Sequence, residues 1–325
     1  MISSINTTGF FCGRELELQE LTGLFHTQKV FVIAGLAGIG KTALIQAFAA
    51  YVNTLEQYRD RVLFITCKNG WTGKDLFSEI IELSGEGGQE PIGTIAGELI
   101  NLLERKSLAL FLDDFHQVED DDSRELVRQA GTLHKGRLVL ATRKRIELPP
   151  MDMIDIYQLK LSGLSDEDTS RIIDQLLKFH HLTELNTDQK KRIFIKTGGY
   201  PFSVKLLISL LISGGQSLES LLEGPGFEEK IEQYLLIRVW NNLDQDEQEI
   251  FMRLSLLRIP VRPEEIPGIP ESMRKKTLGK FLDTFLLEHN QVGLIELHSL
   301  LKEDAARHLD DPRRSKLQLE IADFF

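Results

Sequence analysis

The feature that most constrains this chain is a glycine-rich segment, Gly-Leu-Ala-Gly-Ile-Gly-Lys-Thr, at residues 35–42. It fits the pattern G-x-x-x-x-G-K-[ST] in full, and it lies between an apolar run at 30–34 and a helical pattern at 41–53. Glycines let such a loop curl so that successive backbone N–H groups point at phosphate oxygens, beside the partial positive charge of a helix N-terminus. The segment therefore predicts a phosphate-binding P-loop rather than a chance glycine-rich turn.

The motif also assigns roles to single residues. Lys41 can reach the β- and γ-phosphates of a nucleotide as a point charge, and the hydroxyl of Thr42 can ligate Mg²⁺. The expected ligands are thus a nucleotide and Mg²⁺. The binding residues expected from this segment are Gly35, Gly38, Ile39, Gly40, Lys41, Thr42 and Ala43.

Two carboxylates, Asp113 and Asp114, follow a second apolar run at residues 108–112. Ligands of open α/β sheets bind at the carboxyl ends of the strands. We therefore expect Asp113 to hold Mg²⁺ through water, since Mg²⁺ keeps much of its hydration shell, and Asp114 to orient or activate the attacking water. The alternative for either aspartate is a turn cap. The acidic run at 119–122 is assigned only to the start of a helix, where negative charge complements the helix dipole.

Short apolar runs alternate with amphipathic helical patterns over the first half of the chain. The predicted strands are 30–34, 62–66, 108–112, 137–142 and 156–159, and the predicted helices between them are 41–53, 74–84, 94–104 and 123–133. Strands separated by helices favour βαβ units and a parallel sheet covered on both faces. The expected fold class is therefore α/β, with a P-loop nucleotide-binding domain over residues 1–160.

The strand pattern stops after residue 161. Helical patterns at 166–179, 187–196 and 202–213 predict a small helical domain over 161–224, and Gly214-Gly215 with the segment 223–226 indicates its boundary. Three further helices and a hairpin, formed by 285–288 and 292–297, predict a winged-helix domain over 225–310. An amphipathic helix at 313–325 is expected to start a C-terminal helical region from residue 311.

The net charge of −11 disfavours wholesale binding to nucleic acid or to an anionic membrane, which normally requires clustered Lys and Arg. Cys12 and Cys67 are the only cysteines, too few for a disulfide framework, and they favour a reducing cytoplasm. The N-terminus lacks the pattern of a signal peptide. The longest apolar stretch, 204–212, is far shorter than the roughly 20 residues that span a bilayer.

Further motifs, in the same order along the chain, resemble those of the STAND signalling ATPases of NB-ARC type. Phe11-Cys-Gly13-Arg14-Glu15-Leu-Glu17 is similar to the family's hhGRExE motif. The resemblance implies that Phe11, Gly13 and Arg14 contact adenine and ribose, and hence that the nucleotide is ATP or ADP. By its residues alone, the segment 14–25 is an amphipathic helix after a glycine turn.

Three later motifs complete the resemblance. Arg143, after the predicted strand 137–142, resembles the family's sensor arginine, although Lys144 and Arg145 could equally form solvated surface with it. A guanidinium there can meet a γ-phosphate through two hydrogen bonds. Pro201 of Gly-Tyr-Pro resembles a proline that packs near adenine, and a proline in the first turn of a helix also has a purely structural explanation. His298 of Leu-His-Ser resembles the histidine of the MHD-type motif, which contacts the β-phosphate of ADP.

The motif around His298 departs from the family at both neighbours, with Leu297 for Met and Ser299 for Asp, and Ser299 can simply be a helix N-cap. The resemblance extends from Phe11 to about Arg307. It implies a switch that is closed and monomeric with ADP, and that opens and forms a homo-oligomer with ATP and Mg²⁺. Lys41, Asp113, Asp114 and Arg143 would carry slow hydrolysis. An unknown ligand would act through a sensor region of repeats that we expect to follow residue 325.

Two rival functions remain open from the residues. A DNA-associated AAA-type ATPase also pairs a P-loop domain with a winged helix, and the segment 271–285 carries Arg274, Lys275, Lys276 and Lys280. A metabolic P-loop kinase would need an acceptor site and usually a compact lid. The helical domains that follow the P-loop domain argue against the kinase, and the overall acidity argues against the DNA-associated protein.

Overall fold

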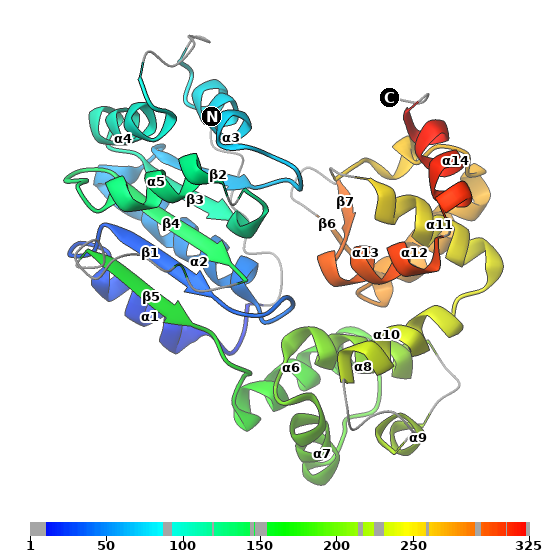
Figure 1. The fold of residues 1–325 in the computed structure, drawn as a ribbon. Coiled ribbons are helices and arrows are strands. Elements are labelled where there is room, and N and C mark those ends of the chain that lie inside the picture. Colours follow the sequence, from blue (N-terminus) through cyan, green and yellow to red (C-terminus); the bar gives the residue numbers. More distant parts are fainter. Residues whose placement is uncertain are drawn as a thin grey trace. The chain divides into compact units, whose positions relative to one another are not determined.

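The computed structural model describes residues 11–86, 93–118, 120–143, 146, 155–213, 217–223, 231–257, 260–289, 294–309 and 311–322. The chain divides into two compact units, Met1–Ser162 and Gly163–Phe325 (Figure 1). The two cysteines are free thiols, and both are buried. None of the helices in the described ranges is long and apolar enough to cross a membrane.

The first unit is built on a parallel five-stranded sheet in the order β2-β3-β4-β1-β5. Nearly every strand residue of β1, β3 and β4 is buried, which explains why these strands are continuous apolar runs rather than alternating ones. The α/β prediction is confirmed. The strands are β1 (Val30–Ala34), β2 (Val62–Thr66), β3 (Ala109–Asp113), β4 (Arg137–Thr142) and β5 (Ile156–Lys160). β3 lies one residue later than predicted because Asp113 pairs in register with Thr66.

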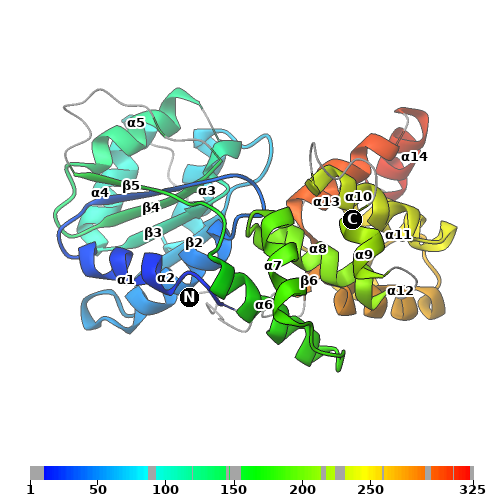
Figure 2. The ribbon, with the colours of Figure 1, turned by 90° about the horizontal axis from the view of Figure 1, so that it is seen from below.

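Helices cover both faces of this sheet (Figures 1 and 2). On one face α1 (Glu15–Leu24) packs on α2 (Lys41–Thr54), and Phe25, Phe31, Phe48 and Tyr58 form an aromatic cluster beneath them. The other face carries α3 (Gly73–Leu83), α4 (Ile95–Lys106) and α5 (Asp121–Ala130). The predicted helix 123–133 begins earlier, because Asp120 caps it by accepting a hydrogen bond from the N–H of Ser123.

The loop that leads into β4 is held by one carboxylate of α4. Glu104 accepts hydrogen bonds from the backbone N–H groups of His134 (3.0 Å), Lys135 (2.9 Å) and Gly136 (3.2 Å). These three donors lower the pKa of Glu104 against the opposing effect of its partial desolvation. The contact fixes the amino end of β4, whose carboxyl end carries Thr142 and Arg143.

The second unit is mainly helical. The predicted helix at 202–213 corresponds to a segment whose residues are mostly buried, which accounts for its unusually apolar sequence. Its first helices are α6 (Asp166–Phe179), α7 (Thr187–Thr197), α8 (Pro201–Ile212) and α9 (Leu218–Leu222). The boundary predicted at Gly214-Gly215 and the segment 224–226 lie outside the described residues.

The remainder of the second unit follows the predicted order of three helices, a hairpin and further helices. These elements are α10 (Ile231–Asn241), α11 (Gln245–Leu256), α12 (Glu271–Asp283), β6 (Leu287–His289), β7 (Ile295–Leu297), α13 (Ser299–Ala305) and α14 (Asp311–Ala322). β6 and β7 pair in antiparallel fashion, and Val261 forms an isolated bridge to Ile295. The winged-helix interpretation and the domain limits stay predictions, and residues 290–293 of the hairpin lie outside the described ranges.

Candidate nucleotide site

The P-loop backbone has the conformation that its glycines permit. Gly38 and Gly40 have φ angles of 74° and 97°, in the left-handed region that side chains with a Cβ rarely adopt. A Cβ on Gly35 would lie 2.9 Å from Cγ2 of Ile39, so the loop is also closely packed at its start. The loop follows β1 and opens α2 at Gly40, where no side chain caps the helix. The N-terminal N–H groups of α2 are therefore available to an anion.

Lys41 extends over this loop from the first turn of α2. Its side chain is buried, and Nζ donates a hydrogen bond to the carbonyl of Leu36 at 3.0 Å. Burial lowers the pKa of Lys41, the charges of Asp114 and Asp113 oppose that shift, and the charge of Arg143 adds to it. The charges of the other three residues predicted to be catalytic therefore all act on Lys41.

Asp113 ends β3 and is nearly inaccessible to solvent, at 2% exposure. One carboxylate oxygen accepts the N–H of Asp114 at 2.9 Å, and the side chain is hydrogen-bonded to Thr42. Burial, and secondarily the charge of Asp114, raise the pKa of Asp113 to about 7, against the hydrogen bonds and the charge of Lys41. Ionised Asp113 is thus costly without a cation, a situation that favours a site for one.

Asp114 has a φ angle of 49°, a left-handed conformation that aspartate tolerates better than most residues. It connects β3 to a short 3-10 helix, Phe115–Gln117. The ring Nδ1 of His116 lies 3.9 Å from Oδ1 of Asp114. The sequence analysis did not single out His116, although its place two residues beyond a strand end was a usable signal.

Cys67 is a second residue that the sequence analysis did not place at the site. It follows β2, and its N–H donates to the carbonyl of Asp113 at 2.9 Å. Burial and the charges of Asp113 and Asp114 raise the pKa of this thiol, so it remains neutral. Adjacent parallel strands bring their carboxyl ends to one edge, which is the signal that could have placed Cys67 there.

The remaining predicted residues of the first unit lie near the P-loop or its flanks. Arg143 follows Thr142, whose carbonyl accepts the N–H of Gly35 at 3.1 Å. Thr42 and Ala43 are exposed, and Phe11 is half-buried. The N–H of Gly13 donates to Glu15, and Arg14 points into the protein interior. Lys144 and Arg145 lie outside the described residues.

Pro201 and His298 belong to the second unit. Pro201 is the first residue of α8, and the next residue, Phe202, stacks on the ring of His298 with centroids 4.0 Å apart. The ring Nδ1 of His298 accepts the N–H of Leu300 at 3.3 Å. The Gly-Tyr-Pro and Leu-His-Ser motifs are therefore in direct contact through these two rings.

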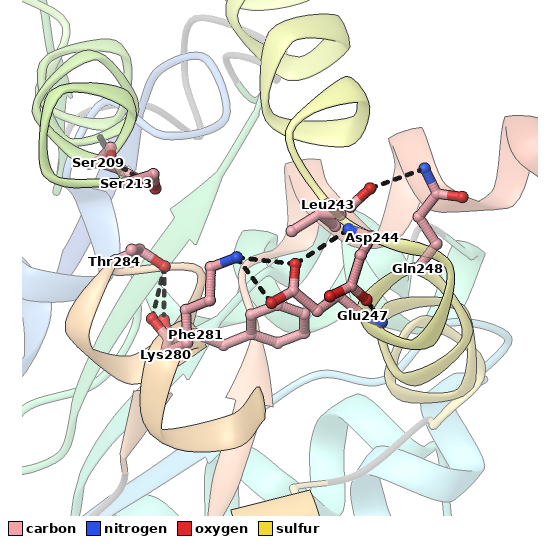
Figure 3. Close-up of polar contacts among 9 residues, drawn as sticks. All are labelled: Ser209, Ser213, Leu243, Asp244, Glu247, Gln248, Lys280, Phe281 and Thr284. Atoms are coloured by element: carbon pink, nitrogen blue, oxygen red, sulfur yellow. Dashed lines mark hydrogen bonds and ion pairs between the residues drawn. The ribbon is translucent and has the colours of Figure 1, made fainter. Parts of the chain in front are cut away.

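Three of the four basic residues of α12 on which the DNA-associated alternative depends, Arg274, Lys275 and Lys280, contact other groups of the chain. Figure 3 shows Nζ of Lys280 directed at the carboxylate of Glu247, at 2.6 and 2.8 Å from its two oxygens. Glu247 is buried, so this pair belongs to the packing of α11 against α12. Lys275 pairs with Glu271 at 2.8 Å, and Arg274 donates to the carbonyl of Ile269 at 2.9 Å. The DNA-associated alternative is not favoured.

The residues present fit a nucleotide with Mg²⁺. Gly38 and Gly40 give the loop its left-handed backbone, a buried lysine follows them, and the hydroxyl of Thr42 is hydrogen-bonded to the buried carboxylate of Asp113. In the described ranges, no group of three or more His, Cys, Asp and Glu side chains could hold a metal ion. Mg²⁺ is usually bound by one or two protein groups together with phosphate and water, and Thr42 and Asp113 would be those groups here.

Comparison with known proteins supports the same assignment. Residues 24–147 match the family model of an AAA domain. The probable disease resistance proteins RF45 and RDL5 of Arabidopsis thaliana are each 25% identical to the chain over 216 residues. A crystal structure of a signal transduction ATPase with numerous domains, with a tetratricopeptide repeat sensor, from Pyrococcus horikoshii has the same fold, with a TM-score of 0.66 at 19% identity.

The matches differ in how much of each protein they include. The plant alignments cover 62% of this chain and only 21% of each plant protein, and the archaeal alignment covers 98% of this chain and 45% of that one. The chain thus spans less than half the length of any of these three proteins. The AAA match supports ATPase activity. The family match indicates an AAA domain over residues 24–147, and the archaeal structure shows that the chain shares the fold of a STAND ATPase.

Proposed function

We propose that the chain is the nucleotide-dependent switch core of a STAND signalling ATPase. It binds ADP in a closed state and ATP with Mg²⁺ in an open, oligomerising state, and slow hydrolysis returns it to the closed state. The observation that carries this proposal is the convergence of Lys41, Asp113, Asp114 and Arg143 at the carboxyl edge of the sheet. These groups would distinguish a triphosphate from a diphosphate by charge.

Each residue has a separate task in hydrolysis. Lys41 exchanges its hydrogen bond with the carbonyl of Leu36 for the β- and γ-phosphate oxygens. Thr42 and Asp113 would hold Mg²⁺, which supplies positive charge to the phosphates when bound. Asp114 orients the attacking water and accepts its proton. Arg143 contacts the γ-phosphate through its two-pronged guanidinium, and this contact is lost when only ADP is bound.

His298 is the proposed reporter of ADP in the second unit. Because its Nδ1 accepts the N–H of Leu300, the neutral ring carries its proton on Nε2, which makes Nε2 the donor toward a phosphate oxygen. The stack on Phe202 fixes the plane of the ring. Pro201 would pack near adenine, so the contact between the two motifs lets base and phosphate be sensed together.

The contacts proposed for ATP and ADP can supply much of the free energy that is needed to shift the equilibrium between the closed and open states. Moving a two-state equilibrium from 1:99 to 99:1 needs about 5.5 kcal/mol of differential binding. A γ-phosphate, its Mg²⁺ and one arginine provide charge-assisted hydrogen bonds of the stronger kind. An activating ligand would supply the remainder.

The test is the identification, by chromatography, of nucleotide extracted from the purified protein. We expect ADP to co-purify with the wild type, and to be lost or replaced by ATP in His298→Ala. His134→Ala is the matched control, because His134 is exposed and contributes only its backbone N–H to the Glu104 contact. An empty site that exchanges freely in all three proteins would rule out the ADP-bound closed state.

A further inference from the structure

Arg14 joins the P-loop to the end of the first unit. Its side chain is only 4% exposed, and Nη2 donates to two carbonyl oxygens, that of Ile39 at 3.0 Å and that of Ser162 at 2.5 Å. Nη1 pairs with the carboxylate of Glu17 at 2.6 Å. A guanidinium is well suited to such a bridge because its donors have a rigid geometry and its charge cannot be titrated away.

Both ends of the P-loop contact the same short segment. At the start of the loop, the N–H of Leu161 donates to the carbonyl of Ala34 at 2.8 Å, and a Cβ on Gly35 would lie 3.4 Å from Cβ of Leu161. Near the end of the loop, Arg14 connects Ile39 to Ser162. A change in the loop therefore acts directly on residues 161 and 162.

The chain continues from Ser162 straight into the second unit, where its next residues are held just as closely. The N–H of Leu164 donates to the carbonyl of Gly199 at 2.8 Å. A Cβ on Gly163 would overlap the carbonyl oxygen of Gly198, so the two backbones are in direct contact. Gly199 lies two residues before Pro201 and α8. The linker 161–164 thus connects the P-loop to the start of α8 through contacts of main chain.

We propose that Arg14 is a positioning residue that couples nucleotide occupancy of the P-loop to this linker, and through it to the second unit. The hydrogen bond from Nζ of Lys41 to Leu36 must break when Lys41 turns to phosphate, which releases the loop at residue 36 and allows Ile39 to move. Arg14 transmits that movement to Ser162. This role differs from the adenine contact that the family resemblance implies for Arg14, and it rests on the proposed switch.

The experiment measures energy transfer in the full chain between dyes on Lys74 of α3 and Lys191 of α7, both exposed. The dyes are attached through unnatural amino acids, which leaves the native cysteines unmodified. The wild type is expected to differ between ADP and ATP with Mg²⁺. At nucleotide concentrations that saturate both proteins, Arg14→Met should lose at least half of this nucleotide-dependent difference. Glu17→Gln is the control, because it removes the negative charge of the partner of Nη1 and keeps both carbonyl contacts.

Other outcomes separate the hypotheses. If Arg14→Met keeps the full difference, the coupling role is wrong; a simultaneous tenfold loss of preference for ATP over GTP would identify a base contact instead. If the wild type shows no difference between nucleotides, the proposed switch fails and the coupling with it. Should Arg14→Met not fold, Arg14→Lys serves the same purpose, because the lysine side chain is one bond shorter and its nitrogen does not reach the position from which Nη2 donates to both carbonyls.

Discussion

Replacement of Asp113 by Asn should stabilise the nucleotide-free first unit, and increasingly so as the pH rises. The buried carboxyl has its pKa raised to about 7 from an ordinary value of 3.8. Between these two values the folded protein binds a proton that the unfolded chain has released, so stability decreases as pH increases. The difference corresponds to an upper bound of about 4 kcal/mol, reached above pH 7.

The measurable consequence is the dependence of the free energy of unfolding on pH. From pH 5 to pH 8 the wild type should lose about 2–3 kcal/mol of stability relative to Asp113→Asn, at up to about 1.4 kcal/mol per pH unit. Asp114→Asn is the matched comparison. The charge of Asp114 is the second cause of the raised pKa, so its removal should reduce the slope without abolishing it.

The assay is urea unfolding of nucleotide-free protein, followed by the fluorescence of Trp71 in a Trp240→Phe background. Trp71 lies in the first unit and Trp240 in the second, so the signal reports the P-loop unit alone. Equal pH dependence in wild type and Asp113→Asn would refute the reasoning. It would mean that the carboxyl titrates near its ordinary value despite its burial.

Three further predictions follow from individual contacts. Phe202→Leu should release the ring of His298 and speed the dissociation of fluorescent ADP up to about tenfold. The reason is that an aromatic pair contributes about 0.5–1.5 kcal/mol. An unchanged dissociation rate would show that the stack does not position the histidine. Glu104→Gln should lower the stability of the first unit by about 1–2 kcal/mol in the Trp71 assay, because its bonds to three N–H groups lose their charge, and an unaltered midpoint would contradict this. Lys280→Met should destabilise the second unit by about 2–3 kcal/mol, measured with Trp240 as the reporter, because Glu247 stays buried without its cation. The half-exposed position of Lys280 keeps this below the value for a fully buried pair, and an unchanged stability of the second unit would contradict the reasoning.

The sequence predicted the nucleotide-binding unit well, for reasons that are local. Strands buried on both faces are continuous apolar runs, and the five strands predicted for the first unit lie within one residue of their observed positions. The P-loop glycines are needed for backbone conformations that other residues avoid, so their spacing alone indicates the loop. Helix ends were less accurate, as at α5, because a capping residue such as Asp120 can start a helix before the apolar pattern begins.

Only the tertiary structure decided what surrounds each functional side chain. The two carbonyl partners of Arg14 are 25 and 148 residues away along the chain, and no periodicity indicates where a guanidinium will point. The same holds for the stack of His298 on Phe202, which joins two motifs that the sequence shows as separate. The raised pKa of Asp113 arises from burial among distant strands, whereas the sequence shows only a carboxylate after an apolar run. The conformational preferences of the backbone depend on residues that are neighbours in the sequence, so the sequence indicates them directly. Burial and charge interactions depend on distances in space, which are set only when the chain folds.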